Sequence, residues 1–339
     1  MPAVKSGKVL VTGVNGFIAG WVTQLLLEHG FTVRGTVRSA EKAIPIRNVL
    51  AAYGDRLEIT VVEDMTLPGA FDEAVIGVDA IVHLASQVHV HAEDPDEIIR
   101  PAVDGTTDIL RSASRSESSV KRIVYVSSLA AVVNSRRGKP VVYTEEDWND
   151  ADPAEVREKG VNANPAAKYR ASKALAEKAA WSFCEEGRAK GAMAWDLVTL
   201  CPPWTFGPVL GAASPDDLTF SVERWFSICT KEVDDPTNWS VTDWADVRDF
   251  ACATLLSLTK PEAGGERFII ARSPFYWKQW VAITRRLLGK PVPEDAQEAY
   301  QFDVAFSSQK SKDVLGLHYR DMEETAAFMV EDFKAKGWC

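Results

Sequence analysis

The stretch KVLVTGVNGFIA, residues 8–19, decides the fold that this 339-residue sequence predicts. Residues 8–12 form a short apolar run that is typical of a buried strand. Residues 17–29 then place apolar side chains at helical spacing and end before Gly30, which predicts a helix. A loop with the pattern Gly-x-x-Gly-x-x-Ala joins the two. Small residues there let the backbone approach a pyrophosphate, and the N-terminus of the helix offers it free N–H groups.

The glycine loop does not follow the Gly-x-Gly-x-x-Gly pattern of the standard dinucleotide fingerprint. Gly and Asn also make ordinary turns between strands and helices, so the loop carries little weight alone. Its position at the first strand–helix junction favours phosphate binding. We therefore predict a cofactor site that includes Thr12, Gly13, Asn15, Gly16, Phe17 and Ile18.

Strand and helix patterns alternate through the first part of the chain. Apolar and β-branched runs predict further strands at 31–37, 57–62, 80–84, 122–126 and 195–200, and helical patterns occur at 96–114 and 166–186. This alternation predicts an α/β fold, a Rossmann-like doubly wound parallel sheet with helices on both faces. The last third is less regular, with a strand expected at 267–271 and a helix at 277–288.

The end of the second predicted strand indicates which dinucleotide binds. An NAD site places an acidic residue there, where it binds the ribose 2′-hydroxyl. This strand instead carries Arg34 and Arg38, with Lys42 soon after and no carboxylate before Glu41. Cations suit a 2′-phosphate, and arginine matches it geometrically. The alternative is a solvated basic strand end, and we favour NADPH/NADP+ as the cofactor.

The chain is expected to divide between cofactor and substrate binding. Residues 1–200 are predicted to form an NADP-binding Rossmann domain, and residues 201–339 mainly a smaller substrate-binding lobe. No linker separates the two, so we expect the lobe to interleave with the sheet, with residues 240–272 returning to the first domain.

Tyr169 and Lys173 lie four residues apart in a predicted helix, which places them on one helix face. Ser128 ends the fifth predicted strand, at the edge where parallel sheets bind ligands. These three residue types suffice for carbonyl reduction. Ser128 would hydrogen-bond the substrate oxygen and Tyr169 would protonate it. Lys173 would hold the nicotinamide ribose and lower the pKa of the tyrosine. Tyr-x-x-x-Lys alone is common on exposed helices, and the order of all three motifs makes it meaningful.

These motifs together resemble an extended short-chain dehydrogenase/reductase. The resemblance is closest to the dihydroflavonol-reductase-like branch, especially fungal carbonyl, aldehyde and methylglyoxal reductases. It covers most of the chain and is densest over residues 8–208. The supporting segments are VRGTVRS at 33–39, VEDM at 62–65, HLAS at 83–86 and EKAAW at 177–181.

The resemblance implies further roles by matching position. Arg38 and Lys42 would bind the 2′-phosphate, and Asp64 and Met65 would line the adenine. Ala85 and Ser86 would pass under the cofactor backbone, and Pro202 would frame the nicotinamide. Residues 203–208 and the 212–217 loop would border the substrate.

Two departures separate the chain from sugar-nucleotide epimerases. Residues 102–106 lack the asparagine with which that segment usually begins in the epimerases, and Cys201-Pro202 replaces an Asn-Pro pair. Three alternatives to a ketone and aldehyde reductase stay open. They are an epimerase or dehydratase that retains NAD, a hydroxysteroid dehydrogenase, and a non-catalytic NADP(H) sensor.

Aromatic residues in the last third are candidates for the substrate pocket. The chain has eleven tryptophans, and Trp204, Phe206, Trp225 and Phe226 could gather around an aromatic substrate. Packing in the core of the lobe is the alternative, and the sequence does not separate the two.

Composition narrows the partners and the compartment. A net charge of −10 argues against nucleic acid or an anionic membrane as partner, and no apolar run reaches the roughly 18 residues of a membrane span. Five scattered cysteines predict reduced thiols in a cytoplasmic protein. His83, His89 and His91 lack the spacing of a metal site, so no metal is expected. The expected partner is a small carbonyl compound, with monomer and homodimer both open.

Overall fold

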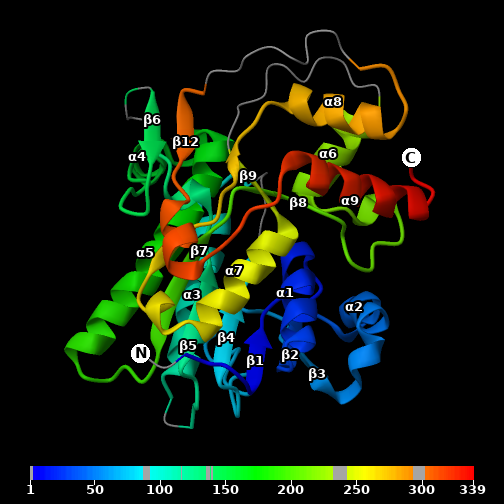
Figure 1. The fold of residues 1–339 in the computed structure, drawn as a ribbon. Helices are drawn as coiled ribbons and strands as arrows, with labels where there is room; N and C mark the ends of the chain where they lie inside the picture. Colours follow the sequence, from blue (N-terminus) through cyan, green and yellow to red (C-terminus); the bar gives the residue numbers. More distant parts are fainter. Residues whose placement is uncertain are drawn as a thin grey trace.

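The structure is a computed structural model that describes residues 3–86, 92–115, 117–134, 138, 140–231, 243–292 and 302–339. A parallel sheet of seven strands lies at its centre (Figure 1), in the order β10-β7-β5-β4-β1-β2-β3. The strands are β1 (Lys8–Val11), β2 (Thr32–Val37), β3 (Leu57–Val61), β4 (Ala80–His83), β5 (Arg122–Val126), β7 (Asp196–Cys201) and β10 (Arg267–Ile269). The doubly wound parallel sheet predicted from the alternating pattern is confirmed.

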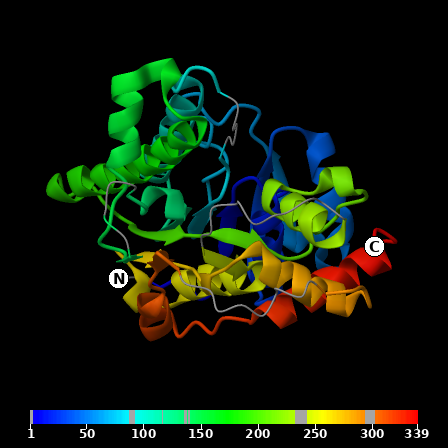
Figure 2. The same cartoon turned by 90° about the horizontal axis from the view of Figure 1, so that it is seen from above.

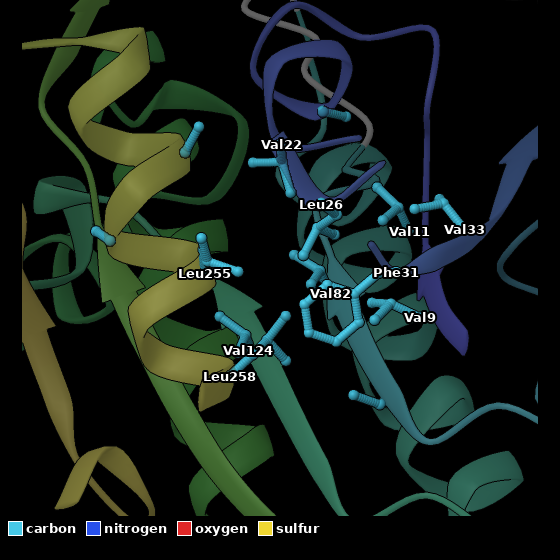
Figure 3. Packing of buried hydrophobic residues seen from close by; sticks show 14 of the residues in the cluster. Val9, Val11, Val22, Leu26, Phe31, Val33, Val82, Val124, Leu255 and Leu258 are labelled. Carbon is cyan, nitrogen blue, oxygen red and sulfur yellow. The ribbon is translucent and has the colours of Figure 1, made fainter. Parts of the chain in front are cut away.

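Helices α1 (Phe17–Glu28) and α7 (Val247–Thr259) cover one face of the sheet. Figure 3 shows how Leu26 of α1 and Leu255 of α7 meet the buried valines of the central strands. Val9 and Val11 of β1 point to this face because side chains alternate along a strand. A large apolar cluster fills this face, as expected for a sheet that is covered on both sides.

Helices α3 (Asp96–Ala113) and α5 (Pro165–Ala189) cover the opposite face. Leu10, the β1 residue between the two valines, packs here with Ile109 of α3 and Ala180 of α5. Pro101 lies inside α3 without ending it. Helix α5 carries the predicted Tyr-x-x-x-Lys pair toward the carboxyl ends of the strands.

The order of the strands reverses between β1 and β4. The chain runs outward from β1 to β2 and β3, and then crosses to β4 on the other side of β1. Ligands of open α/β sheets bind in the crevice at such a reversal, beyond the carboxyl ends of the strands. The glycine loop follows β1, and residues 84–86 follow β4, so both border this crevice.

The second part of the chain builds a smaller lobe on this sheet. A short sheet of β8 (Trp204–Phe206), β9 (Asp243–Asp246) and β11 (Ser273–Pro274) is surrounded by helices α6 (Phe220–Thr230), α8 (Trp277–Leu287) and α9 (Met322–Ala335). Figure 2 shows α8 and α9 side by side. Of the segment 240–272, which was predicted to return to the first domain, the structure describes residues 243–272. Its β10 joins the parallel sheet and its α7 packs against that sheet, whereas its β9 joins the short sheet.

Shorter elements complete the fold. A two-stranded sheet pairs β6 (Val141–Tyr143) with β12 (Val304–Phe306). The short helix α2 (Ile44–Val49) follows β2, and α4 (Ala151–Lys159) packs against α5. Within the described residues, no helix combines the length and apolarity needed to cross a membrane.

Candidate functional site

The glycine loop turns tightly at the carboxyl end of β1. Gly13 has φ +67°, a left-handed conformation that glycine adopts without steric cost. Its N–H donates to Thr36 Oγ1 at 3.1 Å, and the N–H of Gly16 donates to the Gly13 carbonyl at 2.8 Å. Helix α1 begins at Phe17 with no acidic side chain in its first turn and no side-chain cap. Its first N–H groups are therefore available to an anion.

A pocket of about 270 Å³ opens in front of this loop. It lies between the ends of β1, β2, β3 and β4, as the reversal of strand order requires. Its lining residues are Gly13, Asn15, Gly16, Thr36, Val37, Arg38, Lys42, Val62, Glu63, Met65, Phe71, Leu84, Ala85 and Ser86. The structure thus brings together eight of the predicted cofactor residues from four separate segments.

The pocket has the features that a dinucleotide phosphate needs. A Cβ atom on Gly13 would lie 3.4 Å from Ala85, so a side chain there would fill the narrow floor of the pocket. The exposed cations Arg38 and Lys42 stand at its β2 side. Within the described part of the chain, Arg38 makes no hydrogen bond or ion pair, so its guanidinium can meet a phosphate. The residues fit an NADP-type cofactor.

Arg34 does not belong to this cationic group, contrary to the sequence interpretation. It lies inside β2, where its Nε donates to Glu58 Oε2 at 3.1 Å and its Nη1 donates to the carbonyls of Ala74 and Ile76. Alternation along the strand and the partner in β3 turn it away from the pocket. The basic strand end consists of Arg38 and Lys42.

Thr12 supports the pocket from below. It is fully buried, and its Oγ1 accepts hydrogen bonds from the N–H groups of Leu84 and Ala85 at 3.0 and 2.9 Å. The same hydroxyl lies 3.0 Å from His83 Nδ1. Thr12 thereby fixes the segment after β4 to the glycine loop. His83 is itself buried, and burial lowers its pKa to about 3.

Phe17 and Ile18 pack into the protein rather than line the pocket. Phe17 is 8% exposed and joins the apolar core of the lobe, and Ile18 packs against both this core and the α1–α7 core. Their side chains anchor the start of α1, whose backbone faces the pocket.

Of the two residues expected at the adenine, Met65 lines the pocket and Asp64 does not. The Asp64 carboxylate accepts from the Thr66 N–H and hydroxyl at 2.9 and 2.7 Å, and the hydroxyl bond lowers its pKa. The side chain that lines the pocket is that of Glu63. Met65 rests on α3, where a Cβ on Gly105 would approach its methyl group to 2.4 Å.

The catalytic candidates lie beside the pocket. Lys173 Nζ donates to Ser86 Oγ at 2.7 Å and lies 6.0 Å from the centre of the Tyr169 ring. The hydroxyls of Tyr169 and Ser128 are hydrogen-bonded to each other. Ser128 Oγ also accepts from the N–H of Ala130, so it begins the short 3₁₀ helix η3 (Leu129–Ala131). All three side chains therefore meet where β5 ends and α5 passes.

Burial controls the ionisation of this group. It lowers the pKa of Lys173 to about 8. The expected lowering of the Tyr169 pKa is not found, because burial raises it and only the hydrogen bond with Ser128 opposes the change. Lys173 directs its ammonium to Ser86 and does not offset the burial of the phenol. The phenol is therefore held in its protonated form.

Pro202, the residue after β7, is hydrogen-bonded to Leu129, the residue after Ser128. It is buried, and its carbonyl accepts a hydrogen bond from the Leu129 N–H at 2.9 Å. This bond ties the end of β7 to the end of β5. The position suits the predicted role of framing the nicotinamide, although Pro202 does not line the pocket described above.

Three of the four proposed substrate aromatics are core residues. Trp225 and Phe206 have no exposed surface and Phe226 is 4% exposed, and all three pack among the aromatic rings of the lobe. Helix α6 turns Trp225 and Phe226 toward α8 and α9. Trp204 alone is partly exposed, with its ring 5.4 Å from that of the exposed Phe220.

The 212–217 loop lies closer to the cofactor end than expected. Just before it, Gly211 and Leu210 pack near Pro45 and Gly20, and the charge of Lys42 acts on Asp217. Asp217 accepts from the N–H groups of Ala213 and Ser214, both at 2.9 Å, and so closes the loop on itself.

Six pocket residues escaped the sequence interpretation. Five of them end or directly follow a strand of the predicted sheet, and that position is the signal that could have identified them, whereas Phe71 comes from the segment between β3 and β4. The six are Thr36, Val37, Val62, Glu63, Phe71 and Leu84. His89 and His91 lie outside the described residues, and within the described ones no three His, Cys, Asp or Glu side chains gather as a metal site.

Fold and pocket together define a dinucleotide-binding protein of the Rossmann type. Residues 9–271 match the NAD dependent epimerase/dehydratase family, and the chain belongs to this family. That match spans both the glycine loop and the Tyr169–Lys173 pair.

Reductases are prominent among the similar proteins. The chain is 34% identical to ketoreductase azaE of Aspergillus niger, over 93% of this chain and 94% of the relative. It is 32% identical to aldehyde reductase 2 of Sporidiobolus salmonicolor, over 95% and 94%. The yeast methylglyoxal/isovaleraldehyde reductase Gre2, solved with NADPH, superposes with a TM-score of 0.85 at 28% identity, covering 98% of this chain and all of that one. The resemblance to fungal carbonyl reductases is thereby confirmed.

Proposed function

We propose that the chain is an NADPH-dependent reductase of ketones and aldehydes. One observation carries the proposal: Lys173, one turn from Tyr169 on α5, donates to Ser86, which lines the dinucleotide pocket. The candidate proton donor and the cofactor pocket are thus joined through a single side chain.

The chain offers a complete set of residues for holding the cofactor. The glycine loop and the start of α1 would face the pyrophosphate, and Arg38 with Lys42 would face the 2′-phosphate. Met65 and the backbone near Asp64 would line the adenine, and Ala85 and Ser86 would lie under the nucleotide. NADPH, when bound, supplies the hydride for carbonyl reduction.

Tyr169, Ser128 and Lys173 divide the remaining chemistry. Because burial raises its pKa, Tyr169 keeps its proton and can give it to the carbonyl oxygen of the substrate. Ser128, hydrogen-bonded to Tyr169, would orient that oxygen. Lys173, whose ammonium is directed to Ser86 at the edge of the pocket, would hold the nicotinamide ribose. We assign them catalytic roles on this basis.

Other features support a small carbonyl substrate. Trp204, two residues beyond Pro202, is partly exposed and its ring lies 5.4 Å from that of the exposed Phe220, and we propose that the two rings border the substrate. The relatives named for ketone, aldehyde and methylglyoxal reduction agree with this class.

Among the described residues all five cysteines are unpaired, which favours a reducing compartment such as the cytoplasm.

A carbonyl panel tests the proposal. The wild-type protein and Tyr169→Phe are assayed with methylglyoxal, isovaleraldehyde and acetophenone, each with NADPH and with NADH. We expect wild-type turnover with NADPH, and a loss of about a hundredfold or more in kcat for the variant with NADPH affinity retained. Near-full turnover by Tyr169→Phe would contradict the mechanism. NADPH binding without oxidation across the panel would favour a sensor.

The family match also supports an epimerase or dehydratase as a second candidate, since those enzymes share the glycine loop and the Tyr–Lys pair. Such enzymes retain NAD through turnover, so the purified protein would carry tightly bound NAD and ignore added NADPH. The free guanidinium of Arg38 in the pocket favours the reductase.

A further inference from the structure

A buried carboxylate lies one helical turn beyond Lys173. Glu177 follows Lys173 by four residues on α5 and has no exposed surface. Both of its oxygens are engaged: Oε1 accepts from Arg267 Nε at 2.7 Å, and Oε2 accepts from Arg267 Nη2 at 3.1 Å and from Ser127 Oγ at 2.6 Å. A buried charge needs such complete pairing to be tolerated.

Arg267, the first residue of β10, completes the pairing from the opposite side. It is 6% exposed, and its Nη1 donates to the carbonyls of Glu145 and Asp147 at 2.9 and 2.6 Å. Its guanidinium stacks 3.9 Å from the ring centre of Trp148. The arginine therefore joins the edge of the sheet, helix α5 and the segment before α4.

This ion pair reaches the catalytic serine through the residue before it. Side chains alternate along a strand, so Ser127 points to Glu177 while Ser128 points to Tyr169. The helix η3 that follows Ser128 is held by the same group, since the Ala131 carbonyl accepts from Arg267 Nη2 at 3.4 Å and from the Asn149 N–H at 2.9 Å.

We infer that the Glu177–Arg267 pair is a positioning device that sets Ser128 against Tyr169 through the hydroxyl of Ser127. The inference rests on the proposed function, in which Ser128 orients the carbonyl oxygen. The hydrogen bond from Ser127 to Glu177 holds the peptide that carries Ser128, and Tyr169 and Glu177 lie about two turns apart on the same helix α5. This connection acts together with the backbone bonds that hold Ser127 and Leu129 to the end of β7.

The pair also separates two opposite charges on α5. Lys173 and Glu177 stand at the i, i+4 spacing at which helical ion pairs form, yet Lys173 donates to Ser86. Arg267 occupies both carboxylate oxygens of Glu177 and leaves the lysine free for the pocket. Loss of the arginine would draw Lys173 toward Glu177 and away from the cofactor.

A matched control lies at the other end of the same strands. Arg122 opens β5 and Asp196 opens β7, and they form a buried bidentate pair with both distances at 2.7 Å. This pair is as buried as Glu177–Arg267 but lies at the amino ends of the strands, away from Ser128. It reports what the loss of a buried ion pair does to stability alone.

The central experiment is a double-mutant cycle on Ser127 and Ser128. Ser127→Ala, Ser128→Ala and the double variant are assayed with NADPH and the panel carbonyl that the wild type reduces fastest. Rates are expressed per NADPH-binding site. We expect Ser127→Ala to lower kcat about tenfold with the NADPH Kd unchanged, and to add nothing in the Ser128→Ala background. Additive effects, or an unchanged kcat for Ser127→Ala, would overturn the inference.

Two further variants separate positioning from folding. Asp196→Asn should lower the melting temperature but keep the wild-type kcat per site, whereas Glu177→Gln should lower kcat per site even where it remains folded. If Asp196→Asn lowers kcat as much as Glu177→Gln, the pair has only a structural role. Failure of the proposed function would appear separately, as full activity of Tyr169→Phe.

Discussion

Lys173 donates a hydrogen bond from Nζ to Ser86 Oγ over 2.7 Å, and this bond joins helix α5 to the segment that follows β4. Ser86 lines the dinucleotide pocket, and Lys173 lies under the ring of Tyr169. The bond explains how a lysine that is only 7% exposed can keep a polar partner. It also links the cofactor pocket to the catalytic candidates, which leads to the first two predictions.

Activity should depend on the protonation of Lys173. Burial lowers its pKa to about 8, so the ammonium form is present below that pH and is lost above it. If the ammonium holds the cofactor, kcat/KM for NADPH should be constant near neutrality and fall as the pH rises through about 8. A pH–rate profile measured with varied NADPH checks this. A profile that stays flat up to about pH 10 would disagree with it.

The burial of Lys173 should also lower the free energy of unfolding near neutral pH. The pKa of Lys173 falls from its ordinary 10.5 to about 8 on folding, so the unfolded chain binds more protons between these values and the free energy of unfolding rises with pH there. Replacing Lys173 by Met should therefore stabilise the protein near neutral pH, by about 3 kcal/mol at most. The gain should disappear above about pH 10.5.

Urea unfolding at neutral and alkaline pH measures this effect. The control is Lys178→Met, which removes a more exposed lysine from the same helix. Its effect on the free energy of unfolding should be small and similar at both pH values. A gain for Lys173→Met that does not shrink with rising pH would argue against the burial of a charged lysine.

Arg38 should determine the preference for NADPH over NADH. Replacing it by Ala removes a charged partner of the 2′-phosphate and should weaken NADPH binding about tenfold to a hundredfold, with NADH binding little changed. Arg34→Ala is the matched control, since Arg34 is engaged by Glu58 and lies outside the pocket. Fluorescence titration of both cofactors measures the difference. Equal losses for the two variants would contradict the assignment of Arg38.

Replacing two tryptophans of the lobe should have different effects, one on substrate binding and the other on stability. Trp204→Ala should raise KM for the carbonyl substrate with little change in melting temperature, because the ring is partly exposed beside Phe220. Trp225→Ala should destabilise the protein by about 3–5 kcal/mol, because its ring is fully buried. Thermal unfolding and steady-state kinetics on both variants distinguish the roles. A normal KM for Trp204→Ala would remove it from the substrate border.

Much of the sheet and of the pocket could be predicted from the sequence. Each strand of the parallel sheet is a local apolar run, and the loop between β1 and α1 reveals itself by its glycines. Functional residues of such a sheet follow the strand ends, so Gly13, Arg38 and Ser128 could be placed before any contact was known. The i, i+4 spacing did the same for Tyr169 and Lys173.

The sequence by itself determined the order of the elements and the residues that end each strand, because periodicity and turn chemistry are local properties of the chain. Only the tertiary structure decided which side chains of one type share a role. Arg34 and Arg38 look alike until Glu58 of the neighbouring strand engages one of them. The aromatics of the lobe and the Glu177–Arg267 pair depend likewise on packing between distant segments, and burial there also raised the Tyr169 pKa that the local pattern alone had predicted to fall.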